Sequence, residues 1–154
     1  MTSTISKSGL AVLAAALSLV VSAGAAARAA NSPTVVTLSL DRYQTVTHLD
    51  AGDSVGVAPA VVHVHVGDAV VFVNADPVAH HTATGLPSAR FSEPRWTQAA
   101  LTQSGSIGGQ AWSTGDLAPG AHSAPMTASA AGTFLYGCFF HYSAGMRGEI
   151  VVEP

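Results

Sequence analysis

The chain has 154 residues, of which 48% are hydrophobic and only 10% charged, with a formal net charge of −3 at pH 7. After residue 30 it keeps four arginines, no lysine and all nine acidic residues, a net charge of −5. This balance argues against a nucleic-acid partner, which needs a basic surface, and against attachment to a membrane through a polybasic patch. A surface with so few charges is compatible with brief, weakly steered encounters with a partner.

Residues 1–30 have the composition of a secretory signal peptide. Lys7 supplies the positive start, residues 10–21 form an apolar run, and small residues follow up to Ala30. The apolar run is too short for a membrane span, although an N-terminal anchor is the alternative interpretation. Cleavage after Ala27, Ala29 or Ala30 is expected. The sequence therefore predicts export, to the bacterial periplasm, without stable membrane anchoring.

Residues 31–154 are long enough for one small domain. With a single cysteine, Cys138, this domain has no internal disulfide framework. An unpaired thiol in an oxidising compartment needs protection, and metal ligation would supply it.

The first half of the domain reads as strands separated by turns. Residues 35–40 form an expected first strand, with a short strand at 44–48 and longer ones at 60–66 and 69–74. Along 60–66, Val62, Val64 and Val66 share one face, and His63 and His65 share the other, because successive side chains of a strand alternate. This His pair could bind a metal, but it more often lines the wetter face of a sheet.

The middle of the chain is less regular. Asp76-Pro77 is a turn signal that leads to the adjacent residues His80 and His81. Residues 85–111 are rich in Gly, Ser, Pro and Gln, and we interpret them as an insertion with one helical turn near residues 96–101. Long irregular segments tend to be functional, so partner contact is one role for it. Trp96 is equally suited to covering the core.

The end of the chain returns to strands, at 121–129, 132–138 and 148–152. Met126 on the first of these is explained by packing. No stretch after residue 30 has convincing helical periodicity. The fold class predicted is therefore all-β, a Greek-key β-sandwich or barrel of about seven or eight strands.

Residues 138–146, with the sequence CFFHYSAGM, hold the chemistry. Cys138, His141 and Met146 offer a thiolate, an imidazole and a thioether, a soft ligand set that suits copper rather than magnesium or calcium. A trigonal site needs a second imidazole, which His80 or His81 can provide. Cys with two His and a weak axial Met is the ligand pattern of blue-copper electron transfer. The simpler alternative is a buried Cys, a core Met and a surface His that meet by chance.

The same residues carry a family resemblance. The spacing of Cys138, His141 and Met146 resembles that of plastocyanin, and the run from Ala144 to Val152 continues like that family. Upstream, residues 131–138 and 67–74 resemble the strands that lead to the copper ligands of cupredoxins. The likeness covers roughly residues 55–154, except for 88–111. The chain is thus identified as resembling the cupredoxins, plastocyanin-like, which implies the cupredoxin type of sandwich.

The resemblance implies one type 1 copper ion with the ligands His81, Cys138, His141 and Met146. His81 is preferred because the residues His-Thr-Ala-Thr after it resemble those that follow the first ligand in the family, and His80 is the alternative. The aromatic residues Phe139, Phe140 and Tyr142 are expected to keep the site dry.

The function expected is that of a periplasmic blue copper protein that carries single electrons between a redox donor and an acceptor, bound transiently. Four protein ligands leave no open position for a substrate, so the protein is not expected to be an enzyme. The alternative is a copper-binding protein for storage, delivery or sensing, with His63, His65 and the spare histidine of the pair His80 and His81 as further ligands. A monomer is expected.

Overall fold

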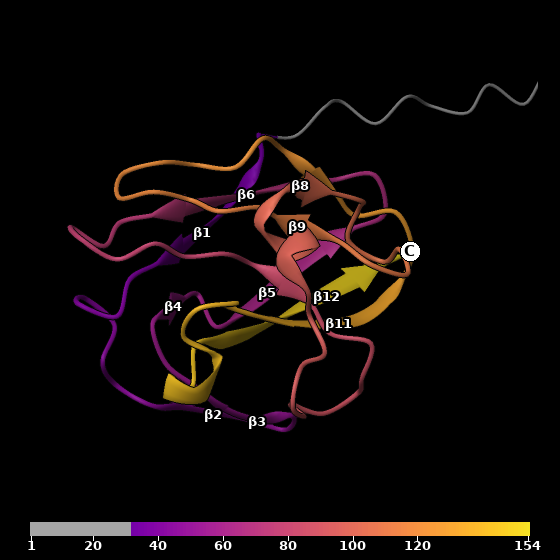
Figure 1. Cartoon of the computed structure of the whole chain (residues 1–154). Helices are drawn as coiled ribbons and strands as arrows, with labels where there is room; N and C mark the ends of the chain where they lie inside the picture. Colours follow the sequence, from indigo (N-terminus) through magenta and orange to yellow (C-terminus); the bar gives the residue numbers. More distant parts are fainter. Residues whose placement is uncertain (1–31) are drawn as a thin grey trace, which may run out of the picture.

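The computed structural model describes residues 32–154, so the expected signal peptide lies outside the described residues. Within that range the chain forms twelve strands and two 3-10 turns (Figure 1). They are β1 (Thr34–Leu38), β2 (Thr47–Leu49), β3 (Gly52–Ser54), β4 (Val57–Ala58), β5 (Val61–His65), β6 (Ala69–Asn74), β7 (Thr84–Gly85), η1 (Gln98–Leu101), β8 (Gln103–Ser104), β9 (Ser113–Thr114), β10 (Met126–Thr127), β11 (Gly132–Gly137), η2 (Tyr142–Ala144) and β12 (Arg147–Glu153).

Two sheets make up the body of the domain. The first has the order β10-β6-β1-β4, and the second has the order β5-β12-β11-β7-β9-β8. β2 and β3 form a separate hairpin. The predicted all-β sandwich is confirmed. The strands outnumber the seven or eight expected because five of them (β4, β7, β8, β9 and β10) are only two residues long.

The core lies between the two sheets. Phe72 of the first sheet meets Tyr136 of the second in a T-shaped contact, with ring centroids 5.3 Å apart, and Trp112 lies beside both. Each fully buried side chain of this size contributes about 1.5–3 kcal/mol to folding. The core between the two sheets is therefore centred on these aromatic rings, and it supports the loops at the end of the sandwich.

The predicted alternation in β5 is confirmed. Val62 and Val64 are buried, while His63 is exposed and His65 is half-buried on the other face. His63 and His65 both lie near Glu153 of β12, at 3.5 and 3.6 Å from its carboxylate oxygens. β12 pairs with β5 in parallel, with Glu153 opposite His65. The histidine pair is thus part of a charged edge of the second sheet.

The strand expected at 121–129 is much shorter in the structure. Only β10 pairs with β6, and His122 adds an isolated bridge to Val73. Pro125 interrupts the run, since proline has no N–H to donate to a sheet. Met126 is buried in the core, in agreement with the packing role expected for it. The short strand expected at 44–48 is β2, which begins three residues later and ends one residue later than expected.

The segment 85–111 packs on the second sheet and extends it. β8 joins the sheet edge through β9, and η1 confirms the helical turn expected there. The indole Nε1 of Trp96 donates to the carbonyl of Gly85 (2.9 Å), and its ring meets Tyr142 edge-on at 5.4 Å. Trp96 therefore covers a small second cluster, formed with Leu86, Leu135 and Tyr142.

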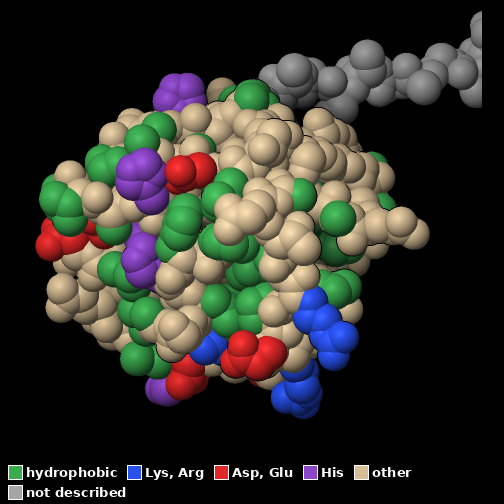
Figure 2. All heavy atoms as spheres, viewed as in Figure 1, with side chains coloured by type: hydrophobic (Ala, Val, Ile, Leu, Met, Phe, Trp, Pro, Cys, Tyr) green, Lys and Arg blue, Asp and Glu red, His purple; other side chains and the backbone are tan. Residues whose placement is uncertain are grey.

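Charged side chains are sparse on the face shown in Figure 2.

Among residues 32–154, no helix has both the length and the apolar character needed to cross a membrane.

Candidate metal centre

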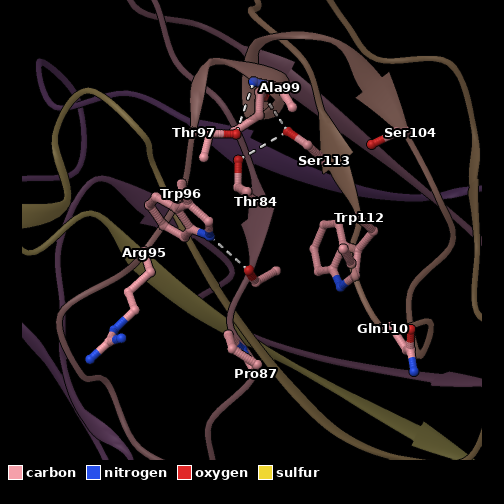
Figure 3. Close-up of a pocket in the computed structure, with 13 residues that line it drawn as sticks. Thr84, Pro87, Arg95, Trp96, Thr97, Ala99, Ser104, Gln110, Trp112 and Ser113 are labelled. Atoms are coloured by element: carbon pink, nitrogen blue, oxygen red, sulfur yellow. Dashed lines mark hydrogen bonds between the residues drawn. The ribbon is translucent and has the colours of Figure 1, made fainter.

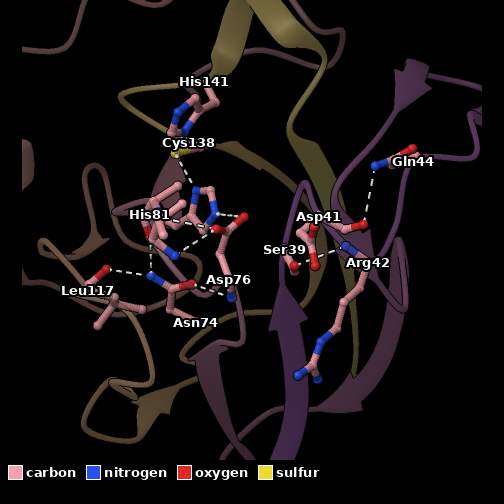
Figure 4. A network of polar contacts seen from close by, with 12 residues as sticks. Ser39, Asp41, Arg42, Gln44, Asn74, Asp76, His81, Leu117, Cys138 and His141 are labelled. Atoms are coloured by element: carbon pink, nitrogen blue, oxygen red, sulfur yellow. Dashed lines mark hydrogen bonds and ion pairs between the residues drawn. The ribbon is translucent and has the colours of Figure 1, made fainter.

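Three side chains that can ligate a metal converge at one end of the sandwich (Figure 4). The Sγ of Cys138 lies 3.7 Å from Nδ1 of His81 and 3.6 Å from Nδ1 of His141. All three atoms lie within 4.8 Å of one another. Among residues 32–154 this is the only group of three or more His, Cys, Asp or Glu side chains so arranged.

The cluster is built on two loops. Cys138 follows directly after β11, and His141 precedes η2. The backbone N–H of Cys138 donates to the carbonyl of Met146 (2.9 Å), which closes the loop just before β12. The N–H of Met146 donates back to the carbonyl of His141 (3.3 Å). The loop from Cys138 to Met146 is thus a closed turn between two paired strands.

His81 comes from the other loop, after β6. Its backbone forms an antiparallel bridge with Leu117, with N–H to carbonyl distances of 3.1 and 2.8 Å. This bridge holds His81 with its side chain inward. The N–H of the next residue, Thr82, donates to Cys138 Sγ (3.4 Å), so the two loops are joined at the sulfur.

His80 points the opposite way. Its side chain is half exposed, and its Nδ1 lies 2.8 Å from Oδ1 of Asp116. His81 has no exposed surface. Of the two imidazoles that the sequence offered, the structure brings His81 to Cys138 and leaves His80 at the surface, as expected for adjacent residues of an extended chain.

Met146 is fully buried in the main core. Its backbone hydrogen bonds to Cys138 and His141 place it at the base of the same loop. Three of the four ligand residues expected therefore have their ligand atoms in one cluster. The fourth, Met146, is connected to two of them by hydrogen bonds between backbone groups.

The cluster is largely shielded from water. Cys138 is buried, and burial raises the pKa of its thiol, an effect that hydrogen bonds from backbone N–H groups such as that of Thr82 only partly offset. Burial also lowers the pKa of His81, although the nearby Asp76 carboxylate acts in the opposite direction. A neutral imidazole keeps a lone pair for a cation, and a bound cation would hold the thiol in its thiolate form.

Sequence reasoning took Asp76 only as a turn residue, whereas the structure places its carboxylate against His81. Oδ2 of Asp76 lies 3.3 Å from Nε2 of His81, on the side of the ring away from Cys138 (Figure 4). Burial by itself raises the pKa of Asp76, but hydrogen bonds from the backbone N–H groups of Ala79 and Val78 and from His81 outweigh it and lower that pKa to about 2. A carboxylate five residues before the histidine was the available signal.

The aromatic residues of the loop take different places. Phe140 is 41% exposed, stacks edge-on with Phe139 at 5.5 Å and lies 6.5 Å from the His80 ring. Tyr142 instead faces the segment 85–111, where its hydroxyl donates to the carbonyl of Ser92 (2.8 Å). The guanidinium of Arg147 lies 4.6 Å from the centre of the Tyr142 ring. Tyr142 therefore anchors the loop to the domain rather than covering the sulfur.

The donor set limits the chemistry of the site. A thiolate and two imidazoles are soft and borderline ligands, which suit copper or zinc and not magnesium or calcium. A cavity of about 270 Å³ lies elsewhere, between Trp96 and Trp112 (Figure 3), and none of the three cluster residues lines it. The cluster is thus suited to holding a soft or borderline metal ion inside the protein.

No protein-family model and no curated protein sequence matches the chain. Solved structures do. A purple cupredoxin from Nitrosopumilus maritimus superposes with a TM-score of 0.51 and 17% identity, over 78% of this chain and 99% of that one. Plastocyanin from Dryopteris crassirhizoma gives a TM-score of 0.46 with 20% identity over 78% and 100% of the two chains. Amicyanin from Paracoccus versutus gives 0.46 with 19% identity over 79% and 81%. The likeness to the first protein shows that this chain has a cupredoxin fold.

Proposed function

We propose that this chain, which has the cupredoxin fold, binds one type 1 copper ion and carries single electrons between redox partners. The observation that carries the proposal is the buried Cys138 Sγ, flanked by Nδ1 of His81 and Nδ1 of His141 at 3.7 and 3.6 Å. The first of the neighbouring structures supports it, since its name describes a purple cupredoxin.

The ligands proposed are His81, Cys138, His141 and, as the weak axial ligand, Met146. A copper ion would supply reversible one-electron chemistry at the Cys138 sulfur. The donor set favours copper over zinc, because zinc in proteins is bound by Cys, His and carboxylates, whereas a thioether is typical of copper sites. A carboxylate in the fourth place would have favoured zinc.

The protein's own part is to hold these ligands still and keep water out. The loop from Cys138 to Met146 is closed by backbone hydrogen bonds and tied to the His81 loop at the sulfur. Ligands that move little between oxidation states leave little to reorganise during electron transfer. His81, Cys138 and Met146 are all buried, so the surroundings of the sulfur have low polarity, which favours the cuprous state.

The partners proposed are a redox donor and an acceptor that dock transiently on a monomer. His141 is the half-buried member of the cluster, so its ring is the shortest way out for an electron. Two exposed hydrophobic side chains, Val78 (81%) and Phe140 (41%), come from the two loops that carry the ligands. A small apolar surface with few charges suits short-lived contact.

We also propose that residues 1–30 are a signal peptide and that the domain of residues 31–154 works in the periplasm. The basic start, apolar run and alanine-rich end of this segment support export.

The spectra of the copper-loaded protein test the function. We expect an intense visible thiolate-to-copper absorption, the EPR signal of type 1 copper, and reversible one-electron cycling in voltammetry. A colourless cupric form would contradict the proposed site. A blue site whose copper passes readily to an acceptor protein would instead favour copper storage or delivery.

Comparison of two neighbouring variants tests the first ligand. His81→Ala is expected to abolish the visible absorption, because it removes the imidazole whose Nδ1 lies 3.7 Å from the sulfur. His80→Ala is the matched control and should leave the absorption unchanged, since this ring bonds to Asp116 at the surface. The measurement is the visible spectrum after copper addition. A blue His81→Ala variant and a colourless His80→Ala variant would reverse the assignment.

A further inference from the structure

Asp76 is a carboxylate with little access to water. It is 4% exposed, and both of its oxygens are engaged. Oδ1 accepts from the backbone N–H groups of Val78 (3.2 Å) and Ala79 (3.0 Å), while Oδ2 faces Nε2 of His81 at 3.3 Å. Its position is therefore determined from two sides.

The end of β6 holds this carboxylate in place. Asn74 is fully buried, and its Oδ1 accepts from the backbone N–H of Asp76 (2.9 Å). The amide Nδ2 of Asn74 donates to the carbonyls of Ala79 and Leu117, both at 2.8 Å. Leu117 also bridges to the backbone of His81. One side chain thus connects the turn that carries the carboxylate to Leu117, whose backbone bridges to that of the histidine.

The two contacts of the His81 ring agree on its tautomer. An ionised carboxylate can only accept a hydrogen bond, so Nε2 of His81 must carry the proton that lies between it and Asp76. The other nitrogen, Nδ1, then has its lone pair directed at Cys138 Sγ. The tautomer that donates to Asp76 is the one that presents a ligand atom to the cluster.

We propose that Asp76 is a positioning residue that holds His81 in the Nε2–H tautomer and lowers the reduction potential of the bound copper. This inference rests on the proposed function. A fixed negative charge beside the outer nitrogen of a ligand stabilises the cupric ion more than the cuprous ion, which has one positive charge fewer. Hydrogen bonds of this kind orient metal-binding histidines and make them more basic.

The alternative is that Asp76 only shapes the turn at residues 76–79 through its bonds to Val78 and Ala79. The two roles differ in what they do to the metal. A turn-forming residue affects folding and leaves the potential unchanged, whereas a charge next to His81 changes the potential of a site that is still assembled.

The first experiment compares Asp76→Asn with Asp116→Asn by voltammetry of the copper-loaded proteins. Both variants remove one negative charge beside a histidine, but Asp116 is exposed and bonds to His80, outside the cluster. The potential should rise in both. The rise should be larger for Asp76→Asn, because the interaction of two charges weakens with distance and with exposure to water, and Asp76 is 4% exposed and faces His81, whereas Asp116 faces His80 at the surface. A rise no larger than in Asp116→Asn overturns the inference.

The second experiment uses the wild-type protein without copper, so it does not depend on whether a variant folds. The ring nitrogens of His81 in the metal-free wild-type protein are assigned by ¹H–¹⁵N NMR. We expect the Nε2–H tautomer, and an Nδ1–H tautomer overturns the inference even when the copper site is blue. A colourless copper protein with the Nε2–H tautomer would instead refute the proposed function and leave the positioning of His81 by Asp76 intact.

Discussion

Cys138→Ser is expected to remove the visible thiolate-to-copper absorption completely and to weaken copper binding most among the ligand variants. Cys138 is the only cysteine in the chain, so no other thiolate can take its place. The variant should still fold. The serine hydroxyl is of similar size and can accept from the N–H of Thr82, which now donates to Sγ. Burying a hydroxyl in place of the thiol should lower the free energy of unfolding by no more than about 3 kcal/mol.

The measurements are the visible and EPR spectra after copper addition, together with denaturation of the metal-free protein. Wild-type protein and Asp116→Asn are the controls, because the latter changes a surface group near the site without touching the cluster. A blue Cys138→Ser variant would end the assignment. A variant that is colourless because it is unfolded would be recognised from its denaturation curve.

Phe72→Ala is expected to cost the most stability of any single truncation considered for this domain. Phe72 is completely buried in β6 and contacts Tyr136 and Trp112, at ring centroid distances of 5.3 and 6.1 Å. Truncation of a buried phenylalanine costs about 3–5 kcal/mol because a cavity replaces the ring. Small domains are stable by about 5–15 kcal/mol, so this is a large share of the total.

Phe140→Ala is the matched control, since it removes the same side chain at a position that is 41% exposed. Its loss of stability should be well below that of Phe72→Ala. The measurement is urea denaturation of both metal-free variants, with circular dichroism as the signal of unfolding. Equal losses in the two variants would mean that the core is not centred on Phe72.

The candidate ligand types could be predicted from the sequence because three of them lie within one loop. Cys138, His141 and Met146 are separated by fixed short intervals, so a single turn brings them near one another. The alternation of valines with His63 and His65 likewise predicted which side chains of β5 are buried, since a strand has a period of two. The scarcity of charge was sufficient to argue against nucleic acid.

The lengths of strands and the place of the segment 85–111 depended on pairing between distant residues. The run at 121–129 has strand-like composition, but Pro125 and the available partner edge of β6 limit it to β10. The segment 85–111 looked irregular, and its order comes from contacts such as Trp96 with Gly85 and Tyr142 with Ser92. Local composition does not contain those partners.

The sequence by itself therefore determined the fold class, the candidate ligand types and the loop that carries most of these candidates, because they depend on near neighbours in the chain. The tertiary structure decided which histidine side chain lies beside Cys138 and which residue contacts the other nitrogen of that ring. His80 and His81 are adjacent and chemically identical, and only the bridge between His81 and Leu117, far along the chain, decides which ring points inward. The turn signal at Asp76 says nothing of the partner of its side chain. In the folded chain the segment after β6 brings this carboxylate against His81 and buries it.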